Sequence, residues 1–268
     1  MIYEKIITQN EKEILSLLDE MGLLSITVPY KIVGDRLIMQ KAQSLPDIEK
    51  AAIDIPRLYC QCLSSLYKYS NTTFSCGIYG IFRSKNNMCT ETNYFLYLKN
   101  EVDRISNELK SYLNAELVLI YKNAINFYET GLENYRNYFE KKTHFELLHG
   151  DLFSGNILLY DNKYVLIDFE YMRFGPKLSE ISFLLLWDII TIPQLNKKAS
   201  LLDDDIDKLR NNNIITDEEK MVLKKVYIPL YIALICLYVS AERYRDCEII
   251  SKGVVAFFEN YYGNMRCE

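Results

Sequence analysis

The amino-terminal part of the chain contains a helical pattern of apolar residues. Four apolar side chains recur at the spacing of one helix face: Ile14, Leu17, Leu18 and Met21. This spacing predicts an amphipathic helix, which Gly22 can end. Thr8 lies three residues before Glu11, and the pair fits a capping box, in which each side chain binds the backbone N–H of the other residue. The sequence therefore predicts a helix that begins just after Thr8.

Two short runs rich in apolar and β-branched residues follow, at residues 26–33 and 36–40. Gly34 and Asp35 separate the two runs. Such a pair between two apolar runs is typical of a tight turn that joins antiparallel strands. We therefore expect a small β-hairpin after the first helix.

Most of the remaining chain has the pattern of amphipathic helices, which resume after Pro176. The predicted helices before the next extended segments cover residues 47–69, 100–114 and 116–141. Residues 147–157 and 164–169 interrupt this run with short extended segments around a loop. The most apolar stretch, residues 226–239, is shorter than the ~20 residues of a membrane-spanning helix. We therefore expect a buried helix there and no membrane insertion.

Length and charge narrow the class of protein. The 268 residues can bury a core without help from a metal or a disulfide. The seven cysteines include no C-x-x-C pair, which favours reduced thiols in a cytoplasmic protein. The first residues lack the pattern of a secretory signal. The net charge of −5 argues against a nucleic-acid partner, because no basic stripe is available to bind phosphates.

The residues that carry chemistry lie between positions 147 and 176. Phosphoryl transfer requires a carboxylate that orients the attacking hydroxyl and oxygen ligands for Mg²⁺. Asp151 can supply the carboxylate. Asn156, five residues later, and Asp168, at the end of the next strand, supply neutral and anionic oxygens suited to Mg²⁺. Each residue alone would be interpreted as a turn or cap residue, but the combination favours a phosphotransfer site.

This segment resembles the aminoglycoside phosphotransferase and choline kinase family, which shares the protein-kinase-like fold. The resemblance rests on His149-Gly150-Asp151 with Asn156, and on the Ile-Asp-Phe-Glu run that contains Asp168. It implies that Asp151 is the catalytic base, that Asn156 and Asp168 bind the metal, and that His149 shapes the loop. It also implies ATP and Mg²⁺ as cofactors and a small-molecule hydroxyl as acceptor.

The resemblance implies an α+β, two-lobed fold with a truncated amino-terminal sheet lobe, residues 1–43 with the hinge, and a large, mainly helical lobe, residues 44–268. The family's glycine-rich hairpin has no counterpart in the first 43 residues, and residues 1–7 can form at most one earlier strand. Lys5 is the candidate for the family's phosphate-binding lysine, with Glu11 as its partner. The alternatives are an exposed strand residue for Lys5 and a capping role for Glu11. Glu180 lies near the position at which many members of the family have an aspartate that anchors the catalytic loop.

The family holds adenine through backbone groups of the hinge. That implies nucleotide contacts at Met39, Gln40, Lys41 and Ala42. Ile38 and Ile167 are candidate apolar walls for the base. Backbone recognition leaves little trace in a sequence, so ATP and GTP are not distinguished.

The acceptor is the least determined part of the prediction. Five residues are candidates for binding it: Glu170, Trp187, Asp188, Tyr231 and Glu242. Aromatic faces and carboxylates suit a cationic amine, as in choline or an aminoglycoside. The spacing of Tyr227, Tyr231, Leu234 and Tyr238, however, is that of a helix face in a core, and this spacing favours core packing over a substrate cage.

The predicted function is therefore an ATP-dependent small-molecule kinase. The alternative is a kinase-like nucleotide-binding or regulatory module with weak or no catalysis, which the short first lobe favours. A protein kinase fits less well, because the sequence after Phe169 lacks an activation segment. The sequence does not determine whether the chain has a protein partner.

Overall fold

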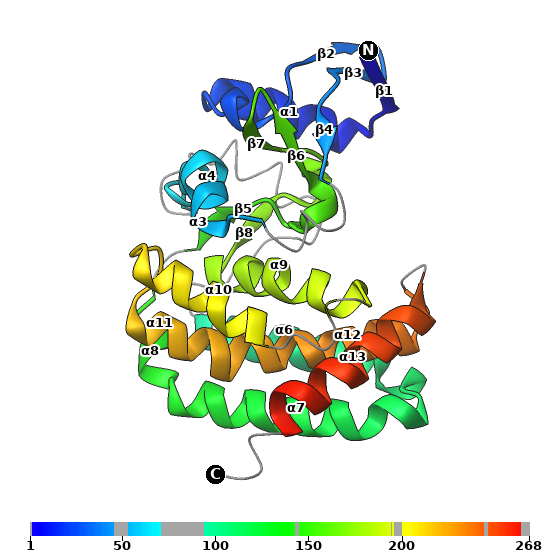
Figure 1. Ribbon diagram of the computed structural model, residues 1–268, viewed down its shortest axis with the longest axis vertical. Helices are drawn as coiled ribbons and strands as arrows, with labels where there is room; N and C mark the ends of the chain where they lie inside the picture. The colour runs from blue at the N-terminus through cyan, green and yellow to red at the C-terminus, as the bar shows by residue number, and fades with distance from the viewer. Residues whose placement is uncertain are drawn as a thin grey trace. The chain divides into compact units, whose positions relative to one another are not determined.

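The computed structural model describes residues 2–45, 53–70, 94–142, 145–193, 195, 200–243 and 246–263 (Figure 1). The chain divides by packing into two compact units. The first unit contains Met1–Thr92 and His144–Glu180, and the second contains Asn93–Thr143 and Ile181–Glu268. This division does not test the predicted lobe boundary at residue 43, which stays a prediction.

The first unit opens with a three-stranded antiparallel sheet in the order β1-β3-β2. Its strands are β1 (Ile2–Ile6), β2 (Tyr30–Val33) and β3 (Arg36–Gln40). The predicted hairpin is confirmed, with Gly34 at φ 64° in the turn between β2 and β3. The predicted start at residue 26 is wrong, because Leu24–Ile26 forms a 3-10 turn, η1. The ladder begins only after Pro29, which has no N–H to donate.

Helix α1 (Gln9–Glu20) confirms the predicted amino-terminal helix. Its buried face includes Ile14, Leu17 and Leu18. The Thr8 side chain accepts a hydrogen bond from the Glu11 N–H at 3.1 Å. Gly22, at φ 68°, follows the helix in the left-handed conformation that glycine adopts without strain. The periodicity of the sequence was therefore sufficient to place this element.

The described part of the first unit also contains a helix and two further small sheets. The helix is built from α3 (Ile55–Leu58), the π-helical η2 (Tyr59–Leu63) and α4 (Ser64–Tyr67). Asp54 caps it, so within the described residues the predicted helix 47–69 begins at Ile55; residues 46–52 lie outside them. One sheet has the order β4-β6-β7, and the other pairs β5 with β8. These strands are β4 (Gln43–Ser44), β5 (Glu146–Leu148), β6 (Ile157–Tyr160), β7 (Lys163–Leu166) and β8 (Arg173–Gly175).

The second unit is helical in its described residues. Its elements are α6 (Tyr94–Leu109), η3 (Lys110–Tyr112), α7 (Ala115–Asn134), α8 (Arg136–Glu140), α10 (Ser200–Asn211), α11 (Asp217–Val222), η6 (Leu223–Tyr227), α12 (Ile228–Ser240) and α13 (Cys247–Tyr262). Helix α9 (Lys177–Thr191) begins in the first unit and continues into the second. Helix α7 packs on α12, which also packs on α13. The predicted helix 116–141 is two helices, because Tyr135 leaves the helical conformation between α7 and α8.

The apolar stretch at residues 226–239 lies in a helix that is longer than the sequence pattern indicated. Elements α11, η6 and α12 form one helix, Asp217–Ser240, of 24 residues. By length and composition alone this helix could cross a membrane. Within the described structure 72% of its most apolar window is buried, which is the pattern of a core helix. The interpretation as a core helix therefore holds, although the predicted length was too short.

Candidate active site

The loop between β5 and β6 contains three of the predicted functional residues, His149, Asp151 and Asn156, and a side-chain amide joins the last two. The Asn156 side-chain amide donates to the Asp151 carbonyl at 2.8 Å and to its carboxylate Oδ2 at 3.1 Å. Burial raises the pKa of the Asp151 carboxyl, the bond from Asn156 lowers it, and the nearby charge of Asp168 raises it further. Asp151 is therefore positioned by Asn156, in a site that favours accepting a proton.

His149, the first residue of this loop, is fully buried. Its Nε2 lies 2.8 Å from the Ile167 carbonyl, and its Nδ1 lies 3.4 Å from the Asp151 backbone N–H. These partners assign the neutral tautomer, in which Nε2–H donates and Nδ1 accepts. Burial lowers the pKa of His149 to about 4. The structure thus makes His149 a neutral brace between the Asp151 loop and the residue that precedes Asp168.

Gly150 lets the loop make a close approach that no other residue would allow. Its φ is +88°, and a Cβ there would lie 1.8 Å from the Tyr171 carbonyl oxygen. The Gly150 N–H donates to Glu180 Oε1 at 2.6 Å, and the Tyr67 hydroxyl donates to Glu180 Oε2 at 3.0 Å. Burial raises the pKa of Glu180, and these hydrogen bonds oppose that effect. Glu180 therefore anchors the loop, and Tyr67 is a partner that the sequence did not reveal.

Asp168 lies two residues after β7, in the left-handed conformation with φ 65° and ψ 59°. The backbone N–H of Ile167 donates to the Asn156 carbonyl at 3.1 Å, which joins the two candidate metal-binding residues through the main chain. Lys5 Nζ lies 2.8 Å from Asp168 Oδ1 and 3.1 Å from the Glu11 carboxylate. The amino-terminal strand and helix are thereby tied to the loop after β7.

The ion pair of Lys5 with Glu11 corrects one detail of the sequence prediction. Thr8 accepts from the Glu11 N–H, but the Glu11 carboxylate binds Lys5 and not the Thr8 backbone, so only half of the predicted capping box forms. Glu11 is 2% exposed, and burial raises the pKa of its carboxyl. Burial also opposes the charge of Lys5, yet the hydrogen bonds to Asp168 and Glu11 outweigh it, and the pKa of Lys5 is raised.

The chain's likeness to known proteins agrees with this geometry. The phosphotransferase enzyme family matches residues 115–205, which contain the loops of Asp151 and Asp168. An ethanolamine kinase from Plasmodium vivax superposes with a TM-score of 0.62 at 15% identity, over 98% of this chain and 74% of that chain. The chain has the fold of the protein-kinase-like phosphotransferases. This confirms the predicted α+β fold class and the resemblance drawn from the motifs.

Two further solved structures show the same fold. A choline/ethanolamine kinase family protein from Mesorhizobium loti has a TM-score of 0.59 at 13% identity and covers 100% of this chain and 87% of its own. A thermostable mutant of the aminoglycoside phosphotransferase APH(4)-Ia, in a ternary complex with ADP and hygromycin B, has a TM-score of 0.58 at 10% identity, with coverages of 97% and 85%. No curated protein sequence matches this chain. At these identities the likeness shows the fold alone.

The donor groups of Asn156 and Asp168 fit a magnesium ion. Mg²⁺ in kinase-type sites uses one or two protein oxygens and completes its shell with water and phosphate oxygens. The Asn156 amide nitrogen is directed at Asp151, so its carbonyl oxygen is the end left for a cation. Asp168 offers a half-exposed carboxylate. Among the described residues no cluster of three His, Cys, Asp or Glu side chains forms a closed metal site.

The predicted nucleotide contacts lie at the end of the first sheet. Met39 and Gln40 are the last residues of β3, and Lys41 and Ala42 lie between β3 and β4. The Gln40 N–H donates to the Pro29 carbonyl at 3.0 Å, and the Gln40 side chain accepts from the Tyr160 hydroxyl. The two residues after β3 are outside the strands. They are therefore the part of the predicted hinge that lies between two strands.

The predicted acceptor residues divide between the two units. Glu170 lies in η5 (Phe169–Tyr171) of the first unit, and its carbonyl accepts from the Asn10 side chain at 2.9 Å. In the second unit, the rings of Trp187 and Tyr231 lie 5.1 Å and 5.7 Å from the ring of Phe183. Sequence reasoning missed Phe183, although it lies one helical turn before Trp187.

The remaining residues of this group are packed differently. Asp188 is buried on α9, whereas Glu242 is exposed just after α12 at φ 52°. Tyr227 is 1% exposed, and Tyr238 packs against a cluster of buried apolar residues. Core packing, which the spacing favoured, is therefore what Tyr227 and Tyr238 show. Tyr231 is only half buried and packs against a half-buried aromatic ring.

Proposed function

We propose that this chain is a small-molecule kinase that transfers the γ-phosphoryl group of ATP to a hydroxyl group of a small acceptor. The observation that carries the proposal is the ion-pair network in which Lys5 Nζ bridges Glu11 and Asp168. Kinases of this fold use such a lysine to hold the nucleotide phosphates next to the metal-binding aspartate. A surface lysine on a terminal strand would have no need of two carboxylates, one of them buried.

Each residue has a distinct role in the proposed reaction. Asp151 orients the acceptor hydroxyl and takes its proton, which its raised pKa favours. Asn156 and Asp168 would hold Mg²⁺, which neutralises charge on the phosphates when bound. Lys5 binds the phosphates, and Glu11 fixes its orientation. His149 stays neutral and transfers no proton.

The nucleotide is proposed to contact the backbone at residues 39–42, with the half-buried Ile38 and Ile167 beside the base. ATP is the proposed donor. A solved relative of this fold is a GDP complex of an aminoglycoside 2′-phosphotransferase, so GTP is the alternative to compare with it. The sequence and the backbone geometry favour neither purine.

The acceptor is proposed to be a small alcohol that carries an amine, choline-like or aminoglycoside-like. Support within the second unit comes from the aromatic group of Phe183, Trp187 and Tyr231, whose ring faces attract cations. The carboxylates of Asp188 and Glu242 are candidates in the same unit, and Glu170 is a separate candidate in the first unit. Solved structures of similar fold include a choline kinase from Streptococcus pneumoniae and the hygromycin B complex. A panel of amino alcohols and aminoglycosides is therefore the first set of acceptors to test.

The test is phosphate transfer from ATP to this panel by the native chain and by Asp151→Asn. Removing a positioned general base should lower turnover by ~10²- to 10⁴-fold. Asp161→Asn is the matched control, because it makes the same chemical change at a residue in the exposed turn between β6 and β7. Full activity in Asp151→Asn would refute the assigned role of Asp151.

A nucleotide-binding module without turnover is the second candidate. It is favoured by the first 45 residues, whose glycines are Gly22 at the end of α1 and Gly34 in a hairpin turn, so neither belongs to a glycine-rich phosphate loop. Binding of an ATP analogue together with no transfer to any acceptor would favour this function over the kinase.

A further inference from the structure

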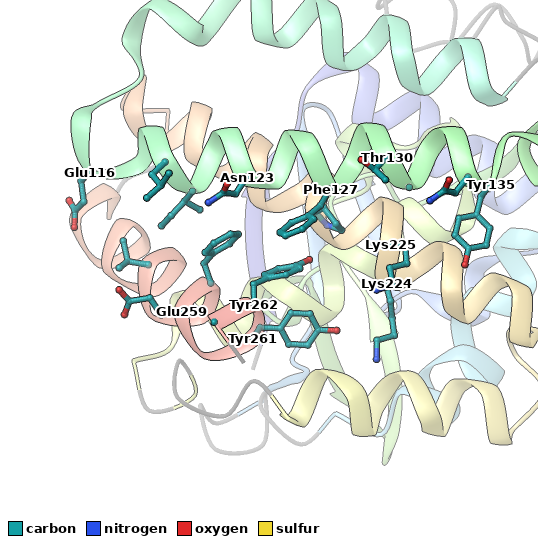
Figure 2. Close-up of a pocket in the computed structure, with 18 residues that line it drawn as sticks. Glu116, Asn123, Phe127, Thr130, Tyr135, Lys224, Lys225, Glu259, Tyr261 and Tyr262 are labelled. Carbon is teal, nitrogen blue, oxygen red and sulfur yellow. The ribbon is translucent and has the colours of Figure 1, made fainter. Parts of the chain in front are cut away.

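The second unit contains a cavity that is lined by none of the predicted site residues. It lies between α7, η6 and α13 and has a volume of about 880 Å³ (Figure 2). All of its lining residues belong to the second unit. Small-molecule pockets typically have volumes of ~300–1,000 Å³ and mostly apolar linings. The cavity therefore has the size of a binding site for a small molecule.

Apolar and aromatic side chains form most of its wall. The rings of Phe127 and Tyr262 stack with their centroids 5.0 Å apart and their planes 13° from parallel. Phe127 is 40% exposed and Leu119 is 63% exposed, although both are large apolar residues. Figure 2 shows Phe127 and Tyr262 facing each other from α7 and α13. Covering these side chains with an apolar ligand body would remove apolar surface from water, which is favourable.

The backbone around the cavity has an unusual construction. A Cβ at Gly131 would lie 2.1 Å from the Lys225 carbonyl oxygen, so α7 and η6 approach each other at backbone distance. Segment η6 is a π-helical turn, and such turns are rare and frequent at functional sites. The close contact with Gly131 fixes the position of the Lys225 backbone, and with it the point from which the Lys225 side chain extends.

The charges at the lysine end of the cavity are unequal. Lys224 Nζ lies 2.7 Å from Asp203 Oδ1, which also accepts from the Tyr261 hydroxyl at 3.2 Å. The charge of Lys224 is therefore neutralised. Lys225 is exposed, and its side chain has no ion pair or hydrogen bond with any residue that the structure describes.

The acidic residues lie toward the other end of the cavity. Glu116 and Glu259 appear on the side away from the lysines in Figure 2. Glu116 is in the first turn of α7, where the helix dipole favours negative charge, and it accepts from the Ser251 hydroxyl at 3.4 Å. An anionic ligand group would be repelled from this end and attracted to Lys225. The lining thus favours one orientation of an amphipathic ligand.

We propose that this cavity binds a small amphipathic anion, with its apolar body over Phe127 and Tyr262 and its carboxylate or phosphate group at Lys225. The site is independent of the proposed phosphotransfer reaction, because it shares no residue with it. It would add a second ligand to the molecule, with its own affinity and its own determinants.

Isothermal titration with decanoate, decanol and decylamine tests this proposal, because the three probes share one alkyl chain and differ in charge. Decanoate should bind more tightly than the other two. Lys225→Gln should weaken decanoate about five-fold, the value of one partly exposed ion pair, and leave decanol unchanged. Phe127→Ala should weaken both. Lys122→Gln is the control, since Lys122 is exposed on α7 and does not line the cavity.

Three results would overturn the proposal. The first is no binding of decanoate to the native chain. The second is unchanged decanoate affinity in Lys225→Gln, with a thermal melt showing that the variant is folded. The third is tightest binding of decylamine that is lost in Glu259→Gln, which would assign the cavity to a cation.

Discussion

Acidification should destabilise the folded chain through His149. The neutral ring uses both nitrogens, since Nε2 donates to the Ile167 carbonyl and Nδ1 accepts from the Asp151 N–H. A proton added to Nδ1 would point at that N–H donor and place a charge in a fully buried site. The folded state therefore resists protonation of His149, whereas the unfolded chain does not.

The size of the effect follows from the pKa of His149. Burial lowers it from 6.5 to about 4. At about 1.4 kcal/mol for each pKa unit, the neutral ring contributes about 3 kcal/mol to the free energy of unfolding. Because the folded pKa is the lower one, this contribution is complete above pH 6.5. It is lost as the pH falls from 6.5 through 4.

Urea denaturation at a series of pH values between 7 and 4 measures this loss. The native chain should lose about 3 kcal/mol relative to His149→Gln. The comparison is needed because burial raises the pKa of Glu180, Asp151 and Glu11, and those groups change stability in the opposite direction as the pH falls. A difference between the two proteins that does not change with pH would refute the reasoning.

A second measurement covers the case in which His149→Gln does not fold. The chain has two histidines, so a His144→Asn variant leaves a single imidazole signal in an NMR titration. That signal should titrate well below pH 6.5. An ordinary value near 6.5 would contradict the buried, neutral assignment of His149.

Two further predictions concern the anchoring of the loop. Gly150→Ala should lower the free energy of unfolding by several kcal/mol in urea denaturation, because the new Cβ would collide with the Tyr171 carbonyl. Gly34→Ala, also at positive φ but with open space around it, should lower it by only about 1–2 kcal/mol. Equal losses in the two variants would contradict the contact at Gly150. In urea denaturation, Glu180→Ala should lower the free energy of unfolding by about 3–5 kcal/mol and Tyr67→Phe by about 1–2 kcal/mol. The double variant should lose less than the sum of the two. Strict additivity would show that the two side chains are not coupled.

The sequence was sufficient to predict the elements whose signals are local. Helix α1 follows from its apolar period and from Thr8, and the hairpin of β2 and β3 follows from the Gly34-Asp35 turn. The loop of Asp151 and Asn156 follows from a motif whose residues are close in the chain. In each case the residues that determine the structure lie within a few positions of one another.

The parts that the sequence did not predict depend on contacts between distant residues. The side chain of Glu11 could complete a capping box or bind Lys5, and only the placement of Asp168 beside Lys5 shows which interaction forms. The bond of Tyr67 to Glu180 spans more than one hundred positions. The two-residue strand β4 has no pattern of its own and exists because β6 pairs with it.

Calorimetric titration with a nonhydrolysable ATP analogue, with and without Mg²⁺, tests the central claim most directly. The native chain should bind the analogue in a magnesium-dependent manner, and Asp168→Ala should lose that dependence, because it removes the only carboxylate proposed to hold the ion. Asp161→Ala, in the exposed turn, should bind like the native chain. Absence of binding by the native chain, or unchanged magnesium-dependent binding by Asp168→Ala, would contradict the assignment of a kinase-type nucleotide site.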